Sequence, residues 1–173
     1  KIGQHIEKTR LVGAAARQAG QRIDLHALVV AGNRLHHRLH RCKGLQRALE
    51  CGYRRVAVFT AASEAFSQKN TNRSIAESLE EFKPLMEDAG KAGVSVRGYV
   101  SAAWWCPYAG RISPQEVVRV TEALLEMGIE EVSLGDTVGL ALPTQVQETL
   151  EMLSSRRKKI ALHFHDTSGT ALA

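Results

Sequence analysis

Long hydrophobic runs are absent from the sequence, and this excludes a helix that crosses a membrane. No apolar stretch in the 173 residues approaches the roughly 18 that such a helix requires. The first residues also lack the succession of basic, apolar and small side chains that marks a signal peptide, although the chain begins with Lys1 and not with methionine. Apolar residues make up 44% of the chain and charged residues 24%, which indicates a folded globular protein and argues against disorder.

Cysteine is scarce, and its few occurrences form no recognisable pattern. Cys42, Cys51 and Cys106 are odd in number, and none belongs to a CxxC motif. We therefore expect reduced thiols in an intracellular protein rather than a disulfide framework. Cys106 has no evident base beside it in the sequence that would activate a thiol, so a structural role is expected for it.

Acidic residues are missing from residues 34–47, where basic residues gather. The basic and histidine side chains there are Arg34, His36, His37, Arg38, His40, Arg41, Lys43 and Arg47. One interpretation is a surface for nucleic acid or phosphate. The stretch has no aromatic residue for base stacking, which favours a solvated segment, so nucleic acid is not the expected partner. We interpret residues 34–42 as an insertion within a separate N-terminal segment, residues 1–52.

From residue 53 onward, short β-rich runs alternate with amphipathic helical patterns. Strands are predicted at residues 55–60, 94–100, 131–135 and 159–165, with an earlier one at 26–31. Helices are predicted at residues 6–19 and 43–51 and after Ser74, Ser113 and Pro143. Pro84 should kink or break the helix that begins after Ser74. This alternation predicts right-handed βαβ units and a parallel sheet in an α/β protein.

Periodicity leaves two architectures open, a doubly wound sheet and a (β/α)8 barrel. The polar residues favour the barrel, because they follow the ends of successive strands, where barrel enzymes carry their functional residues. These residues are Ser63, Glu64, Ser101, Asp136, Thr137, His163, His165 and Asp166. A whole barrel needs about 250 residues. We therefore expect a partial (β/α)8 barrel with parallel strands, of about four to five βα units.

The sharpest local signal is His163-Phe-His-Asp166. Residues i and i+2 of a strand point to one side, so both imidazoles can enter one site while Phe164 turns into the packing behind them. Such a pair suits a divalent metal whose remaining ligands are oxygens. The alternative is a pair of histidines that form hydrogen bonds at a strand end.

Asp136 and the Ser63-Glu64 pair follow other strand ends. The Asp136 carboxylate could orient a substrate hydroxyl or a metal-bound water, or it could cap the turn that follows it. Ser63 and Glu64 could reach the mouth of the barrel and bind substrate. Arg97 lies within a strand and would need a carboxylate or ligand partner if it faces inward.

Several stretches read together resemble the 3-hydroxy-3-methylglutaryl-CoA lyase family over about residues 53–173. They are Phe59-Thr-Ala-Ala-Ser-Glu64, Ser95-Val-Arg-Gly-Tyr-Val-Ser101, Cys106-Pro-Tyr108, Ile112-Ser-Pro114, Ser133-Leu-Gly-Asp-Thr137 and His163-Phe-His-Asp-Thr167. The resemblance implies a barrel that cleaves this acyl-CoA to acetyl-CoA and acetoacetate with Mg²⁺ or Mn²⁺, in leucine degradation and ketone body metabolism. It also implies a homodimer for the intact protein, in the cytoplasm of bacteria or the mitochondrial matrix of eukaryotes.

Carried over by position, the resemblance makes His163 and His165 metal ligands, with His163 also catalytic, and places Asp136 at the substrate hydroxyl. The family's Arg-Asp-Gly motif is not found in this sequence, and its later asparagine ligand and catalytic cysteine would lie beyond Ala173. We therefore expect an incomplete fragment of low activity. The alternatives are a related metal-dependent acyltransferase or aldolase barrel, such as an isopropylmalate or homocitrate synthase, and a non-catalytic fragment.

A partial barrel leaves two edges of a parallel sheet unpaired, and unpaired edges associate. We predict that the 173-residue chain forms associated or poorly soluble species. Analytical ultracentrifugation tests this, and a monodisperse monomer would contradict it.

Overall fold

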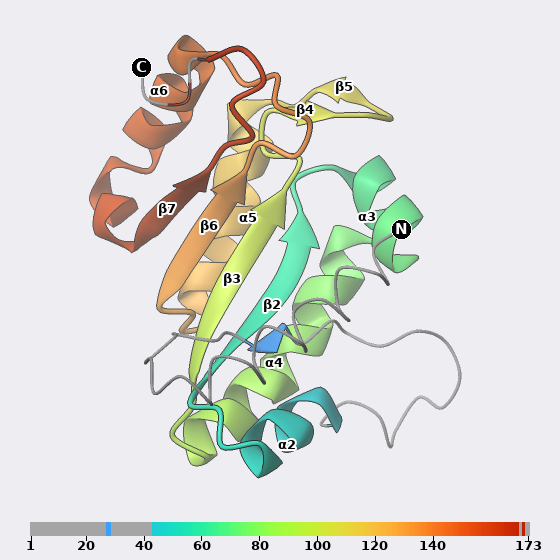
Figure 1. Ribbon diagram of the computed structural model, residues 1–173, viewed down its shortest axis with the longest axis vertical. Helices are drawn as coiled ribbons and strands as arrows, with labels where there is room; N and C mark the ends of the chain where they lie inside the picture. Colours follow the sequence, from blue (N-terminus) through green and yellow to red (C-terminus); the bar gives the residue numbers. More distant parts are fainter. Residues whose placement is uncertain (1–26, 29–42, 170, 172–173) are drawn as a thin grey trace.

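The computed structural model describes residues 27–28, 43–169 and 171, and a parallel sheet forms its centre (Figure 1). The strands are β1 (Ala27–Leu28), β2 (Arg55–Ala61), β3 (Ser95–Ser101), β6 (Glu131–Gly135) and β7 (Ile160–His163). They follow one another across the sheet in chain order, and each neighbouring pair is parallel. A doubly wound sheet would reverse its order at a switch point, whereas consecutive order is that of a barrel wall.

The helices that connect the strands form one layer. They are α2 (Lys43–Glu50), α3 (Glu64–Thr71), α4 (Ile75–Lys91), α5 (Pro114–Glu126) and α6 (Pro143–Met152), with a 3-10 helix, η1 (Ser154–Lys159), before β7. Helix α5 packs against β3 and β6 and contacts both α4 and α6. Figure 1 shows α5 behind these two strands. Helices on one face of a consecutive parallel sheet are the arrangement of (β/α)8 units, as the sequence predicted.

The two faces of the sheet differ in composition. The helix-facing side carries Val56, Val58, Val96, Val100, Val132 and Leu134, which are all buried. Gly98 lies in the same face, and a Cβ there would come within 3.2 Å of the Leu124 side chain, so the glycine lets α5 approach β3 closely. The opposite face corresponds to a barrel interior. Its paired rows are Ala57–Arg97–Glu131 and then Phe59–Tyr99–Ser133–Ala161, and the pairs Ala61–Ser101 and Gly135–His163 follow at the carboxyl end.

Most predicted boundaries agree with the structure, and of the kink or break expected at Pro84, the break does not occur. Helix α4 continues through Pro84 from Ile75 to Lys91 and is not broken. Phe82 and Leu85 are buried against the sheet, and each such side chain contributes roughly 1.5–3 kcal/mol, which offsets the approximately 3 kcal/mol cost of an interior proline. The helix predicted at residues 6–19 and the insertion at 34–42 lie outside the described residues.

Two features were not predicted. Helix α3 is short and mostly polar, so it has no apolar stripe that a periodicity argument can detect. The antiparallel hairpin of β4 (Trp105–Cys106) and β5 (Gly110–Arg111) has two residues in each strand, too few for alternation to show. Within the described part of the chain, no helix combines the length and apolar character needed to cross a bilayer.

The capping box of α4 generates a stability prediction. The Ser74 hydroxyl accepts a hydrogen bond from Glu77 N at 3.0 Å, and the Glu77 carboxylate accepts one from Ser74 N at 2.8 Å. We expect Ser74→Ala to lower the free energy of unfolding by about 0.5–2 kcal/mol, measured by urea denaturation. Ser74→Thr keeps the capping oxygen and serves as the control.

The same capping box predicts a pH dependence. The hydrogen bonds from the Ser74 backbone and side chain lower the pKa of Glu77. A lowered carboxyl pKa stabilises the fold above the unfolded-state pKa, and the contribution is lost as pH falls through the folded-state value. The stability difference between wild type and Glu77→Ala should therefore shrink on acidification. A difference that stays constant between neutral pH and about pH 3 would contradict this.

Candidate active site

His163 and His165 lie together at the carboxyl end of β7. His163 is the last residue of the strand and pairs with Gly135 on the interior face of the sheet. The two imidazole rings have centroids 5.2 Å apart and meet edge to face at 83°. Phe164 turns the other way and stacks on the buried Trp104, with ring centroids 5.7 Å apart. The strand end therefore presents two neighbouring imidazoles on one side and an aromatic anchor on the other.

A backbone carbonyl orients the His165 ring. Its Nδ1 lies 2.8 Å from the carbonyl oxygen of Asp136, which follows the adjacent strand. A carbonyl oxygen only accepts hydrogen bonds, so Nδ1 carries the proton and donates it. In the neutral ring Nε2 is then left with the lone pair that a metal ion requires. This arrangement suits a metal ligand and was not evident from the sequence motif.

The Asp136 carboxylate does not meet the imidazoles. It is buried, and its Oδ1 accepts hydrogen bonds from Leu140 N at 3.1 Å and Ala141 N at 3.2 Å. It points toward the helix side of the sheet, where it lines a cavity together with Leu162 and Phe164. The geometry is that of the turn-capping alternative, and the Asp136 residue reaches the histidines through its carbonyl. A direct role at the substrate hydroxyl stays a prediction.

Ser63 and Glu64 are engaged in internal contacts. Ser63 is the N-cap of α3: its hydroxyl accepts from Phe66 N at 3.3 Å and donates to the Cys106 sulfur at 3.0 Å. The exposed Glu64 carboxylate accepts from Ile75 N, at the start of α4, at 3.1 and 3.3 Å. Cys106 is buried and also accepts from two backbone N–H groups, which is the expected structural role. Substrate binding by Ser63 and Glu64 stays a prediction.

The interior face below the histidines supplies further polar groups. Gly135, which pairs with His163, has no side chain, so space remains beside the imidazole ring on that side. Lower on this face, Arg97 has the partner that the sequence required, because its guanidinium lies 2.9 Å from the Glu131 carboxylate on the adjacent strand. Tyr99 and Ser133 pair with each other between the Arg97 row and the histidine end, and the sequence did not single them out as candidate site residues. The parallel register places them on this face, and the register is known only from the structure.

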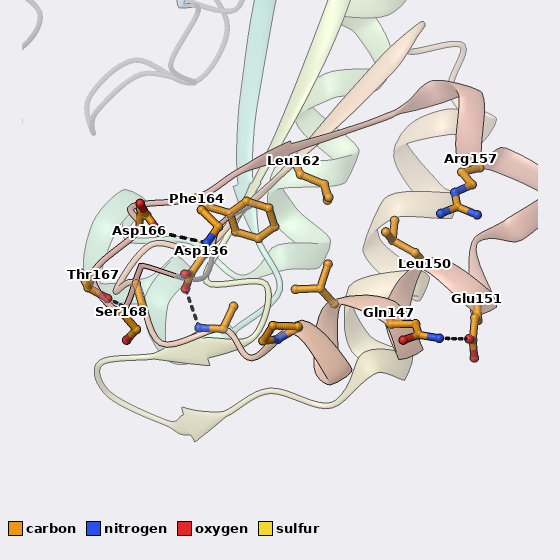
Figure 2. Close-up of a pocket in the computed structure, with 15 residues that line it drawn as sticks. Asp136, Gln147, Leu150, Glu151, Arg157, Leu162, Phe164, Asp166, Thr167 and Ser168 are labelled. Atoms are coloured by element: carbon orange, nitrogen blue, oxygen red, sulfur yellow. Dashed lines mark hydrogen bonds between the residues drawn. The ribbon is translucent and has the colours of Figure 1, made fainter. Parts of the chain in front are cut away.

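The described cavity lies on the other side of β7. It has a volume of about 480 Å³ and is bounded by α6, β7 and the segment that follows β7 (Figure 2). Val146, Leu150, Leu162 and Phe164 form its apolar wall, and Arg157 lies at one end. Since Leu162 and His163 are successive strand residues, their side chains point to opposite faces. The cavity is therefore a groove between helix and strand, distinct from the histidine pair.

The two imidazoles are the candidate metal ligands at this strand end. No group of three or more His, Cys, Asp or Glu side chains that could hold a metal ion occurs among the residues that the structure describes. Two imidazoles, one with a defined tautomer, suit a divalent cation whose remaining ligands are oxygens. Those oxygens would have to come from substrate, water or other residues.

Comparison with known proteins identifies the family. The model of the HMGL-like family matches residues 12–173, which is most of the chain. The chain belongs to this family. The match extends beyond residues 53–173, where the motifs lie, and the family prediction is confirmed.

Relatives within the HMGL-like family carry a consistent name. A hydroxymethylglutaryl-CoA lyase from Bacillus subtilis is 49% identical over 133 residues, 76% of this chain and 44% of that protein. A 3-hydroxy-3-isohexenylglutaryl-CoA/hydroxymethylglutaryl-CoA lyase from Pseudomonas aeruginosa is 50% identical with the same coverage. The chain thus spans less than half the length of these curated relatives.

Solved structures of the family confirm the partial-barrel fold. The crystal structure of hydroxymethylglutaryl-CoA lyase from Pseudomonas aeruginosa superposes with a TM-score of 0.77 at 45% identity, covering 93% of this chain and 52% of that one. A structure of an HMG-CoA lyase from Acinetobacter baumannii in complex with coenzyme A and 3-methylmalate has a TM-score of 0.67 at 32% identity, covering 73% and 42%.

The contacts of the Asp136 carboxylate generate a prediction that tests its role as a cap of the loop that follows β6. Asp136→Ala leaves two backbone N–H groups without their acceptor, which should lower the free energy of unfolding by about 1–3 kcal/mol. Asp136→Asn keeps an oxygen at the capping position and should lower the free energy of unfolding by less than Asp136→Ala does. Hydrogen exchange at Leu140 and Ala141 should accelerate in the alanine variant. Unchanged exchange there would show that the carboxylate does not hold the loop.

Proposed function

We propose that this chain is part of a metal-dependent carbon–carbon lyase that cleaves 3-hydroxy-3-methylglutaryl-CoA to acetyl-CoA and acetoacetate. The observation that carries the proposal is the His165–Asp136 hydrogen bond in a chain of the HMGL-like family. It leaves Nε2 of one imidazole ready for a metal ion, beside a second imidazole on the same strand end. The names of the bacterial relatives support the substrate.

His163 and His165 would hold a divalent cation, Mg²⁺ or Mn²⁺. Bound there, the cation would acidify the tertiary hydroxyl of the substrate and stabilise the charge that develops as the carbon–carbon bond breaks. His163 is exposed on the interior face, where its ring can contact both the ion and the substrate. Asp136 supports the site by orienting His165, and Ser63 and Glu64 are the proposed substrate contacts at the mouth.

The partner proposed for this site is an acyl-CoA, as the coenzyme A complex of the Acinetobacter baumannii relative suggests. The proposed setting follows the relatives, which include bacterial enzymes and a mitochondrial one from Bos taurus. We propose a bacterial cytoplasm or the mitochondrial matrix as the compartment. A homodimer is proposed for the whole protein.

A second candidate is a fragment that does not turn over substrate alone. The limited donor set of the described residues and the coverage of 44% of the Bacillus subtilis relative both favour it for the isolated chain. A synthase that condenses acetyl-CoA with a 2-oxo acid is a third candidate, because such enzymes would use the same imidazole pair.

Acetoacetate release decides among these candidates. We expect negligible turnover from the 173-residue chain with Mg²⁺ or Mn²⁺. We expect activity from a chimera that joins this chain to the part of the Pseudomonas aeruginosa relative that it does not cover. His163→Ala or His165→Ala in the chimera should lower activity by at least about a hundredfold, since each removes a ligand. Lys83→Ala, on the exposed surface of α4, is the matched control.

Three outcomes would change the proposal. Saturable activity of the chain alone would refute the fragment interpretation. Coenzyme A release from acetyl-CoA and a 2-oxo acid, without cleavage of 3-hydroxy-3-methylglutaryl-CoA, would favour the synthase. Full activity of both histidine variants would show that the imidazoles are not metal ligands required for the reaction.

A further inference from the structure

The loop that follows β3 contains a strained residue at the edge of the candidate site. Ala102 is fully buried and has a φ of 52°, a left-handed conformation that residues with a Cβ rarely adopt. Strain of this kind persists only where surrounding contacts impose it. The contact here is a hydrogen bond of 2.7 Å from Ala102 N to the Thr137 hydroxyl oxygen, in the loop that follows β6.

Thr137 shares a peptide plane with the carbonyl that orients His165. The carbonyl oxygen of Asp136 and the nitrogen and Cα of Thr137 belong to one planar peptide unit. Holding the Thr137 side chain therefore limits the direction in which the Asp136 carbonyl points. That carbonyl accepts the hydrogen bond from Nδ1 of His165 at 2.8 Å. A chain of two hydrogen bonds and one rigid plane thus connects Ala102 to an imidazole.

A second contact holds the same loop from its other side. The Thr167 hydroxyl donates to the Gly139 carbonyl. Gly139 has a φ of +72°, and a Cβ there would lie 2.5 Å from Cγ2 of Thr167, so the loop and the segment after His165 fit closely. The peptide plane before Thr137 therefore lies in a loop fastened to the segments after β3 and β7.

We propose that Thr137 is a positioning residue for His165. Its hydroxyl oxygen fixes the Asp136 carbonyl so that the ring keeps its proton on Nδ1 and leaves Nε2 for a metal ion. The hydrogen bond of this hydroxyl is with Ala102 N, so it acts on the ring through the Asp136–Thr137 peptide. Only the last step, metal binding, rests on the proposed function; the tautomer does not.

Solid-state nitrogen-15 NMR of the histidine rings, which does not require a soluble monomer, tests the inference on the full 173-residue chain. At alkaline pH, where imidazoles are neutral, wild type should show the Nδ1–H tautomer at His165. Thr137→Val keeps the side-chain shape but removes the acceptor, so the ring should shift toward the Nε2–H tautomer that free imidazoles favour. Affinity for Mn²⁺ alone should fall about tenfold or more. Thr137→Ser restores the oxygen and should restore both readouts.

Thr121→Val is the matched control. It makes the same chemical change at another buried threonine, on α5, where the hydroxyl donates to the Val117 carbonyl at 2.6 Å. It should lower stability without changing the His165 tautomer or the Mn²⁺ affinity. If Thr137→Val does not fold, Ala102→Gly is added, because glycine adopts the left-handed conformation without strain.

The inference is overturned by a wild-type His165 in the Nε2–H form, or by Thr137→Val with unchanged ring shifts and Mn²⁺ affinity. An equal change of both readouts in Thr121→Val would also overturn it, since general destabilisation would then be sufficient. If the tautomer responds as stated but the chimera cleaves no acyl-CoA, the proposed function fails and the positioning role stands.

Discussion

The parallel register between β6 and β7 is the constraint on which the rest of the site depends. Gly135 pairs with His163, and the ladder continues past the strands with Asp136 N donating to the His163 carbonyl at 2.9 Å. Because side chains alternate along a strand, this register places His163 inside and Asp136 outside. A slip of β7 by one residue would move both imidazoles to the helix side of the sheet. Every assignment at the site therefore follows from one pairing.

That register is itself held by packing on the helix side. Val132 and Leu134 of β6 are fully buried, and Leu124 of α5 and Leu153 after α6 are buried with them. Trp104 connects this layer to the site, since its ring stacks on Phe164 and its indole donates to Thr149 of α6. Phe164 lies between the two histidines in sequence, so apolar contacts on one face determine where the imidazoles lie on the other.

The fold was accessible to sequence reasoning because local patterns determine it. The strand at Glu131–Gly135 and the capping box at Ser74 were both predicted, and each depends on residues within a few positions of one another. At Pro84 the sequence predicted a kink or a break, and the helix is not broken, because the compensating burial of Phe82 and Leu85 is a tertiary effect. Local propensity does not contain that information.

The candidate site was predictable only in part for the same physical reason. The pairing of two imidazoles follows from alternation along one strand, so the motif showed it. The orientation of His165 depends on a carbonyl 29 residues away in the sequence, and no pattern indicates that contact. The role of the Asp136 carboxylate could not be chosen from the sequence for a related reason. A carboxylate after a strand can cap a turn or bind a ligand equally well until the register of the strand is known.

Asp136 shows how one residue can serve structure and chemistry through different atoms. Its carboxylate satisfies two N–H groups of the loop and its carbonyl fixes an imidazole. A buried carboxylate engaged in this way is costly to redirect, because any movement toward a substrate would leave those two donors unsatisfied. Asp136 is held by these three hydrogen bonds, which suits a site whose geometry is formed before a ligand binds. The strained backbone at Ala102 fits the same account, since strain is retained where neighbouring contacts over-determine a conformation.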